Sequence, residues 1–206
     1  MERSQKMVDA RDEILAECAL AFEANADDCN KYLKAVSIPF FEPDLFTGPS
    51  MNANAIVGYL RDSVDWTSLR NDHDKAIAQA KAGKFVIAAM TSAELNSTNG
   101  PLAVVVGDDG RLSGKELVPI CYEGSLNASA RVQRKRVSET FGAQVAQEKK
   151  ISYFCRGVQT VPAVAALSRL VDHLRGLRFS TVEMGTVALT RRSGKNLLEP
   201  ALKSKK

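Results

Sequence analysis

The spacing of apolar residues changes part-way along the chain, and this change restricts the fold more than any other feature of the sequence. Up to residue 83 apolar residues recur at helical spacing, as in Leu15, Cys18 and Phe22. Between residues 84 and 155 they gather instead into short runs that favour strands, separated by Gly, Asn and Asp. Helices followed by strands predict an α+β fold in which the early helices pack on an antiparallel sheet.

Capping residues and helix breakers give approximate bounds for these elements. Asp27 or Asp28 is suited to cap a second helix that Pro39 ends, which places Cys29 in its first turn. Asn71 or Asp72 caps a later helix that runs to residue 82. The other predicted helices cover residues 8–25 and 52–63, and the predicted strands cover residues 84–90, 102–106, 117–122 and 151–155.

A separate pattern begins after Gly157. Thr160 as a cap and Pro162 at the first helical position predict a helix that closes at Gly176. One strand around residues 186–190 and a disordered lysine-rich tail complete the prediction. We therefore expect a main domain over residues 1–157 and a C-terminal helical extension with a basic tail over residues 158–206.

The composition is that of a globular domain without a metal site. The chain has 206 residues, of which 45% are hydrophobic, enough for the core of one domain. Its four cysteines lack the paired short spacings of a zinc site, and it has only two histidines. We expect neither a metal nor a cofactor, and interpret Cys18 and Cys155 as small buried hydrophobic residues.

The charge pattern bears on nucleic-acid binding, and the N-terminal sequence bears on the cellular location of the chain. The net charge of +4 comes largely from clusters at residues 134–136, 149–150 and 203–206. No aromatic stacking pattern accompanies them, so we expect solvated faces and no specific nucleic-acid binding, with an unspecific basic interaction domain as an alternative. Without an apolar signal core or a membrane span, the sequence predicts a soluble chain made in the cytoplasm, which leaves export without a signal peptide open.

Five segments resemble a known family. The nucleophile helix of NlpC-type cysteine amidases is similar to DDCNKYLKAVSIPF, and the segment that follows it in type VI secretion amidase effectors is similar to NANAIVGYLRDSVDW. The first three core strands of those effectors resemble AKAGKFVIAAM, NGPLAVVVGD and PICYEGSLNAS. The resemblance implies a papain-like fold that cleaves an amide in the peptidoglycan stem and is delivered into a target cell's periplasm. Its partners would be cell-wall peptide or a protein, such as an immunity protein.

The resemblance assigns three catalytic positions, of which one is changed. Cys29 takes the nucleophile position, where the start of a helix favours a thiolate; a structural buried cysteine is the alternative reading. The family's general base is a histidine that follows a glycine, but here Pro101 follows Gly100, and proline cannot accept a proton. Glu123 resembles the third position, where it could orient an imidazole or act as a base if burial raised its pKa; an exposed carboxylate is the alternative.

The sequence gives little reason for either histidine to act as the general base in place of the one missing at position 101. His73 lies in the first turn of a predicted helix, where a capping or solvated role is expected, and His173 lies in the added C-terminal helix. Losing a general base lowers a rate about a hundredfold to ten-thousandfold. The sequence therefore predicts impaired or lost hydrolysis, and leaves open a non-catalytic binding protein or a cysteine hydrolase or transferase with its base at His73, His173 or Glu123.

Overall fold

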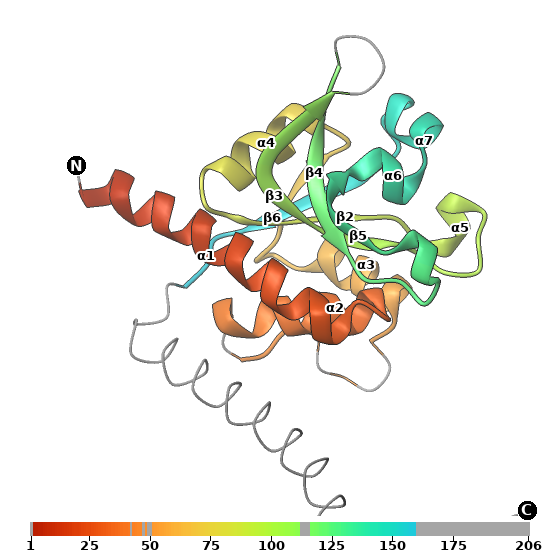
Figure 1. Cartoon of the computed structure of the whole chain (residues 1–206), viewed down its shortest axis with the longest axis horizontal. Coiled ribbons are helices and arrows are strands. Elements are labelled where there is room, and N and C mark those ends of the chain that lie inside the picture. The colour runs from red at the N-terminus through yellow and green to blue at the C-terminus, as the bar shows by residue number, and fades with distance from the viewer. Residues whose placement is uncertain (1, 42, 47, 49–50, 112–115, 160–206) are drawn as a thin grey trace, which may run out of the picture. The chain divides into compact units, whose positions relative to one another are not determined.

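Six antiparallel strands form one sheet in the order β1-β6-β2-β3-β4-β5 (Figure 1). Four of them confirm the predicted strands: β2 (Phe85–Ala89), β3 (Leu102–Arg111), β4 (Leu117–Glu123) and β6 (Ser152–Arg156). The two edge strands, β1 (Thr67–Arg70) and β5 (Val132–Arg136), were not predicted. Each buries a single residue, Leu69 or Val132, so neither has the alternation of apolar and polar residues that identifies a half-buried strand.

The four helices predicted before residue 84 are present, although the first begins earlier than predicted. They are α1 (Glu2–Asn25), α2 (Cys29–Ser37), α3 (Ala53–Asp62) and α4 (His73–Lys81), and the short 3₁₀ helix η1 (Ile38–Phe40) follows α2. The other helices in the described residues span only three to five residues each, too few for a periodic pattern: α5 (Ser92–Leu95), η2 (Ala128–Ala130), α6 (Val137–Phe141) and α7 (Ala143–Gln147).

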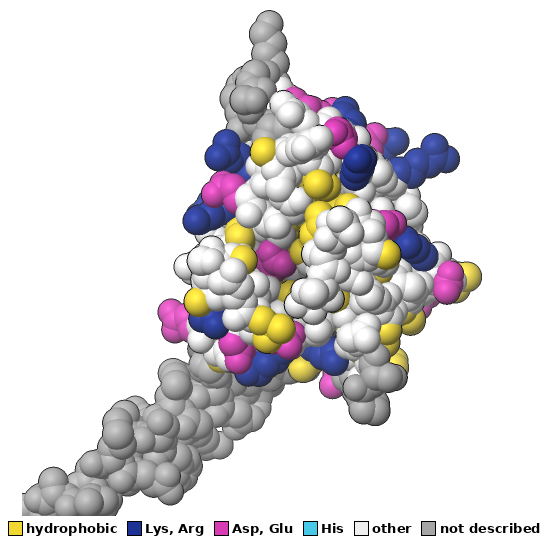
Figure 2. All heavy atoms as spheres, turned by 90° about the vertical axis from the view of Figure 1, so that its right-hand side faces the viewer, with side chains coloured by type: hydrophobic (Ala, Val, Ile, Leu, Met, Phe, Trp, Pro, Cys, Tyr) yellow, Lys and Arg dark blue, Asp and Glu magenta, His cyan; other side chains and the backbone are white. Residues whose placement is uncertain are grey.

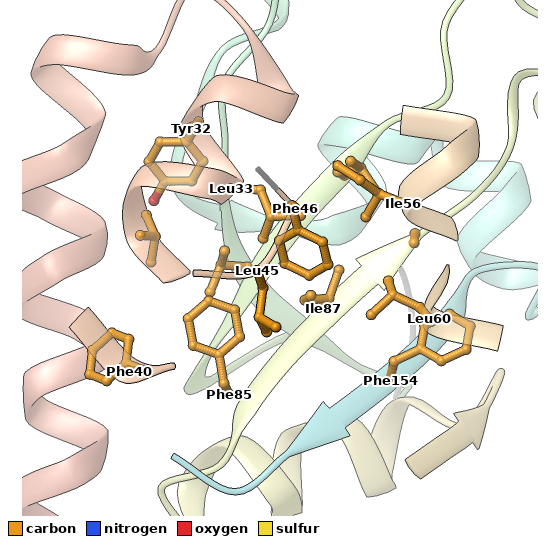
Figure 3. Packing of buried hydrophobic residues seen from close by; sticks show 14 of the residues in the cluster. Tyr32, Leu33, Phe40, Leu45, Phe46, Ile56, Leu60, Phe85, Ile87 and Phe154 are labelled. Carbon is orange, nitrogen blue, oxygen red and sulfur yellow. The ribbon is translucent and has the colours of Figure 1, made fainter. Parts of the chain in front are cut away.

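The helices cover both faces of the sheet, because successive side chains of a strand point to opposite faces. In β2, Phe85 and Ile87 point into a core that includes Tyr32 and Leu33 of α2 and Ile56 of α3 (Figure 3). Val86 and Ala88 point the other way, into a second core with α4, α6 and α7, whose members include Ala76, Val137, Ala146 and Tyr153. The fold is therefore α+β with an antiparallel sheet, as predicted, but α4 covers the face opposite α2 and α3.

The computed structural model of the chain describes residues 2–41, 43–46, 48, 51–111 and 116–159. The predicted helix after Thr160, the strand around residues 186–190, the basic tail and His173 lie outside the described residues. Residue contacts join Met1–Val161 in one compact unit, and the backbone N–H of Gln159 still donates to the carbonyl of Phe40. Within the described ranges, no helix combines the length and the apolar character needed to cross a membrane.

Candidate functional site

The start of α2 lies tightly against the end of β4. The N–H of Ser125 donates to the carbonyl of Ala26 at 2.8 Å. A Cβ atom placed on Gly124 would come within 2.7 Å of the carbonyl oxygen of Asp28 and 2.9 Å of the Cβ of Tyr32. Glycine at position 124 thus permits the close approach that brings the first turn of α2 next to Glu123.

The start of β3 approaches the same helix from another direction. Gly100 lies so close to the turn after β2 that a Cβ there would meet the Met90 carbonyl oxygen at 2.5 Å and the Ser92 nitrogen at 3.0 Å. The carbonyl oxygen of Gly100 is 3.8 Å from the sulfur of Cys29, within reach of the thiol proton. The residue that follows Gly100, Pro101, is buried at this junction.

These segments enclose a pocket of about 440 Å³ that contains Cys29, Pro101 and Glu123. The structure thus brings together the three positions that the sequence assigned to one site. Figure 2 shows the face on the side of α5, α6 and α7, where mostly neutral surface surrounds a hollow with an acidic group in it. Neutral polar side chains dominate the rest of the lining: Asn30, Asn52, Asn54, Ser97, Thr98, Asn99, Ser125, Asn127 and Thr140.

The thiol of Cys29 is not activated, although it occupies the first turn of a helix. Burial and, to a smaller extent, the charges of Glu123 and Asp28 together raise the pKa of Cys29 to about 12. Asp28 is the N-cap, and its carboxylate accepts the N–H groups of Asn30 at 2.7 Å and Lys31 at 3.0 Å. The expected lowering of the pKa of Cys29 is therefore wrong, because burial and the two carboxylates outweigh the backbone N–H groups at the start of the helix.

Glu123 is buried at the end of β4, with 6% of its surface exposed, so the alternative of an exposed strand-end carboxylate is wrong. Burial raises the pKa of Glu123 to about 8, and a hydrogen bond with Thr140 of α6 opposes this rise. The carboxyl group is therefore mostly protonated at neutral pH. In that form it can donate a hydrogen bond, but it cannot accept a proton from the thiol.

His73 is buried in the second core and does not line the Cys29 pocket. It is 3% exposed and packs edge to face on Tyr153 in the second core, where Ala146 is also buried. Its Nε2 is 2.9 Å from the Ala146 carbonyl oxygen and its Nδ1 is 2.8 Å from the Tyr153 hydroxyl. Since a carbonyl only accepts, Nε2–H donates to it, and in a neutral imidazole Nδ1 then accepts from the tyrosine hydroxyl. The expected capping or solvated role is wrong, and both ring nitrogens are already engaged away from the pocket.

Sequence reasoning missed several residues of the pocket. Thr140 comes from α6, which is too short to be predicted, and residues 97–99 belong to an irregular turn after α5. Other lining residues lie in the segments that resemble the amidase family, although the sequence assigned them no role: Asn30, Asn52, Asn54, Asn99, Ser125 and Asn127. Among the described residues, no group of three or more His, Cys, Asp and Glu side chains is arranged to hold a metal ion.

No protein-family model and no curated protein matches this chain.

The close contact at Gly124 gives a first prediction. We expect Gly124→Ala to lower the free energy of unfolding by about 1–3 kcal/mol, since the added Cβ would press on two backbone carbonyls that cannot move independently. Urea unfolding measures this change. The control is Gly58→Ala in α3, where nothing lies within 4 Å and alanine should stabilise the helix by about 0.5–1 kcal/mol. Equal effects at both positions would contradict the tight packing at Gly124.

Proposed function

We propose that this chain is a papain-like domain of the NlpC type that has kept the pocket of a peptidoglycan amidase and lost hydrolysis. It binds the peptide stem of the cell wall without cleaving it. One observation carries the proposal: Cys29, Pro101 and Glu123 line one pocket, in the places that the resemblance gives to the nucleophile, the base and the orienting residue. On this proposal the chain is made in the cytoplasm and delivered to the periplasm of a target cell, where an immunity protein is a second partner.

The loss of hydrolysis follows from the chemistry of the pocket. A cysteine amidase needs a thiolate and a group that returns a proton to the leaving amine. With a pKa of about 12 the thiol of Cys29 is almost entirely protonated at neutral pH. Pro101 provides no proton acceptor, and no histidine is among the described residues that line the pocket.

Binding of a peptide agrees with the lining of the pocket. The side chains that surround Cys29 are mainly amides and hydroxyls, which can donate to and accept from peptide groups. No lysine or arginine is among the described residues of the lining, so the pocket has no counter-charge for a strongly anionic ligand. Its volume of about 440 Å³ lies within the range of pockets that hold small molecules or short peptide segments.

A cysteine hydrolase that uses Glu123 as its base is the second candidate. The observation in its favour is the burial of Glu123, which raises the pKa of this carboxyl to about 8, near the value that suits proton transfer at slightly alkaline pH. The thiol of Cys29, whose hydrogen-bond acceptors are the Gly100 carbonyl and the side chain of Asn30, would then lose its proton to Glu123. If this candidate is correct, the rate at which peptide fragments are released increases above pH 8, where Glu123 loses its proton.

The test is co-sedimentation of the full chain with purified peptidoglycan, with soluble fragments analysed by mass spectrometry. We expect binding without fragments. Ala130→Trp should weaken binding about tenfold because Ala130 lines the pocket, whereas Ala128→Trp, on the same 3₁₀ helix but outside the lining, should leave binding unchanged. Fragment release that Cys29→Ala abolishes would favour the hydrolase, and equal binding by the two tryptophan variants would refute recognition through this pocket.

A further inference from the structure

A second cavity, of about 650 Å³, lies away from the Cys29 pocket at the middle of β3. Its lining comes from five elements, α1, α4, β3, β4 and β5, and consists of Arg11, Lys81, Gly107, Asp108, Ile120 and Arg134. In Figure 1, α1 and α4 lie on either side of β3 at this place. Arg11 and Arg134 face the one described anion of the lining, Asp108, while Lys81 has an interaction partner of its own. The two arginines therefore leave one positive charge in excess over Asp108.

Asp108 fixes two of these cations next to each other. Its Oδ1 accepts from Arg11 Nη2 at 2.9 Å, and its Oδ2 accepts from Arg134 Nη2 at 2.7 Å and Nε at 3.1 Å. Both carboxylate oxygens are therefore occupied by guanidinium groups from opposite ends of the described chain. Each guanidinium has five N–H donors, so the pair retains donors beyond those that Asp108 takes.

The backbone around Gly107 and Arg134 accommodates the guanidinium groups of Arg11 and Arg134. A Cβ at position 107 would lie 2.5 Å from Arg11 Nε, so only glycine leaves room for the guanidinium across β3. The pairing of β3 with β4 is irregular between Val106 and Asp109, which is the kind of bulge that redirects a side chain. Arg134 has φ of +53°, a conformation that is strained for arginine and is held here by its surroundings.

One donor in this arrangement has no partner. Arg11 Nε is buried, and within the described part of the chain it makes no hydrogen bond. A buried N–H group without a partner is costly, and sites of this kind in native proteins commonly receive a water or an ion. The unpaired donor lies against the wall formed by Gly107, at the edge of the cavity.

We propose that this cavity binds the phosphate group of a small phosphorylated molecule. Guanidinium groups match the oxygens of a phosphate in pairs, and a phosphate anion would balance the positive charge that the two arginines hold in excess over Asp108. The site is separate from the proposed peptide pocket, in which no described lining residue is a lysine or arginine. The two sites share β3, which begins next to the peptide pocket and reaches the phosphate site at Gly107.

The test uses the full chain and inorganic phosphate as the probe. Isothermal titration at constant ionic strength should show saturable binding of phosphate, and sodium chloride should show none. Arg134→Gln should weaken this binding about tenfold. Lys135→Gln removes the same charge from the next residue, which does not line the cavity, and should have little effect. Arg134→Lys keeps the charge but loses the paired donors, so it should also weaken binding.

Three results would overturn the proposal. The first is the absence of saturable phosphate binding beyond the effect of ionic strength. The second is an equal loss in Arg134→Gln and Lys135→Gln, which would indicate general charge attraction in place of a defined site. The third is binding to vesicles that contain an anionic phospholipid, with no binding of inorganic phosphate or glycerol phosphate, which would assign the basic residues to a membrane surface. Unfolding curves without phosphate verify that each variant is folded.

Discussion

Pro101→His is expected to raise the rate at which iodoacetamide alkylates Cys29 at neutral pH by about a hundredfold. Position 101 is buried in the same pocket as Cys29 and follows the glycine whose carbonyl contacts the thiol. An imidazolium in that place would stabilise a thiolate, whereas the present thiol, with a pKa of about 12, is almost entirely protonated. The reactive species would therefore become far more abundant.

Peptide mass spectrometry over time measures this rate and needs no knowledge of the natural ligand. The other cysteines, Cys18, Cys121 and Cys155, are buried and serve as internal references. Pro101→Gln is the matched control, because it removes the ring without adding a group that can carry a proton at neutral pH. Should glutamine accelerate alkylation as much as histidine does, the change would reflect only easier access to the thiol. No acceleration in Pro101→His would show that position 101 is not placed to act as a base.

The local parts of this site could be predicted from the sequence because their causes are local. A side chain that caps a helix bonds to N–H groups two and three residues further along, so the polar run before Cys29 was enough to place Cys29 in the first turn, and the structure identifies Asp28 as the cap. In the same way Asp72, one of two predicted candidates, caps α4. The short apolar run within residues 84–90 similarly identified β2, whose two faces both enter cores.

The charge state of the site could not be predicted, because it depends on contacts between distant residues. Glu123 is buried by the close approach of α2, which Gly124 permits, and it bonds to Thr140 of a five-residue helix. The helix dipole alone predicted a lowered pKa for Cys29, but burial and two carboxylates, of Glu123 and Asp28, outweigh it. The environment of His73 likewise depends on Tyr153, eighty residues away.

The buried Glu123 makes the stability of the fold depend on pH. Its ordinary pKa is 4.5, and in the folded chain it rises to about 8. Between these values the folded state holds a proton that the unfolded state has released, so the free energy of unfolding falls as pH rises. This contribution is fully present below pH 4.5 and is lost as pH rises through 8. We expect the wild type to lose about 4 kcal/mol between roughly pH 5 and pH 8.5 through this group.

Glu123→Gln should remove that dependence while keeping the size of the side chain and an oxygen that can accept from Thr140. At about pH 8.5 the variant is then more stable than the wild type by roughly 4 kcal/mol, and near pH 5 the two differ much less. Urea unfolding followed by the fluorescence of Trp66, the single tryptophan and a buried one, gives both values.

Glu139→Gln is the control for this prediction, since Glu139 lies next to Thr140 on α6 but is exposed. It should leave the pH dependence of stability as it is in the wild type. If Glu123→Gln and the wild type lost stability in parallel between pH 5 and pH 8.5, Glu123 would be ionised in the folded chain at neutral pH. A second charged carboxylate beside that of Asp28 would then make the pocket favour cationic groups, and the proposed recognition of neutral peptide amides would have to be abandoned.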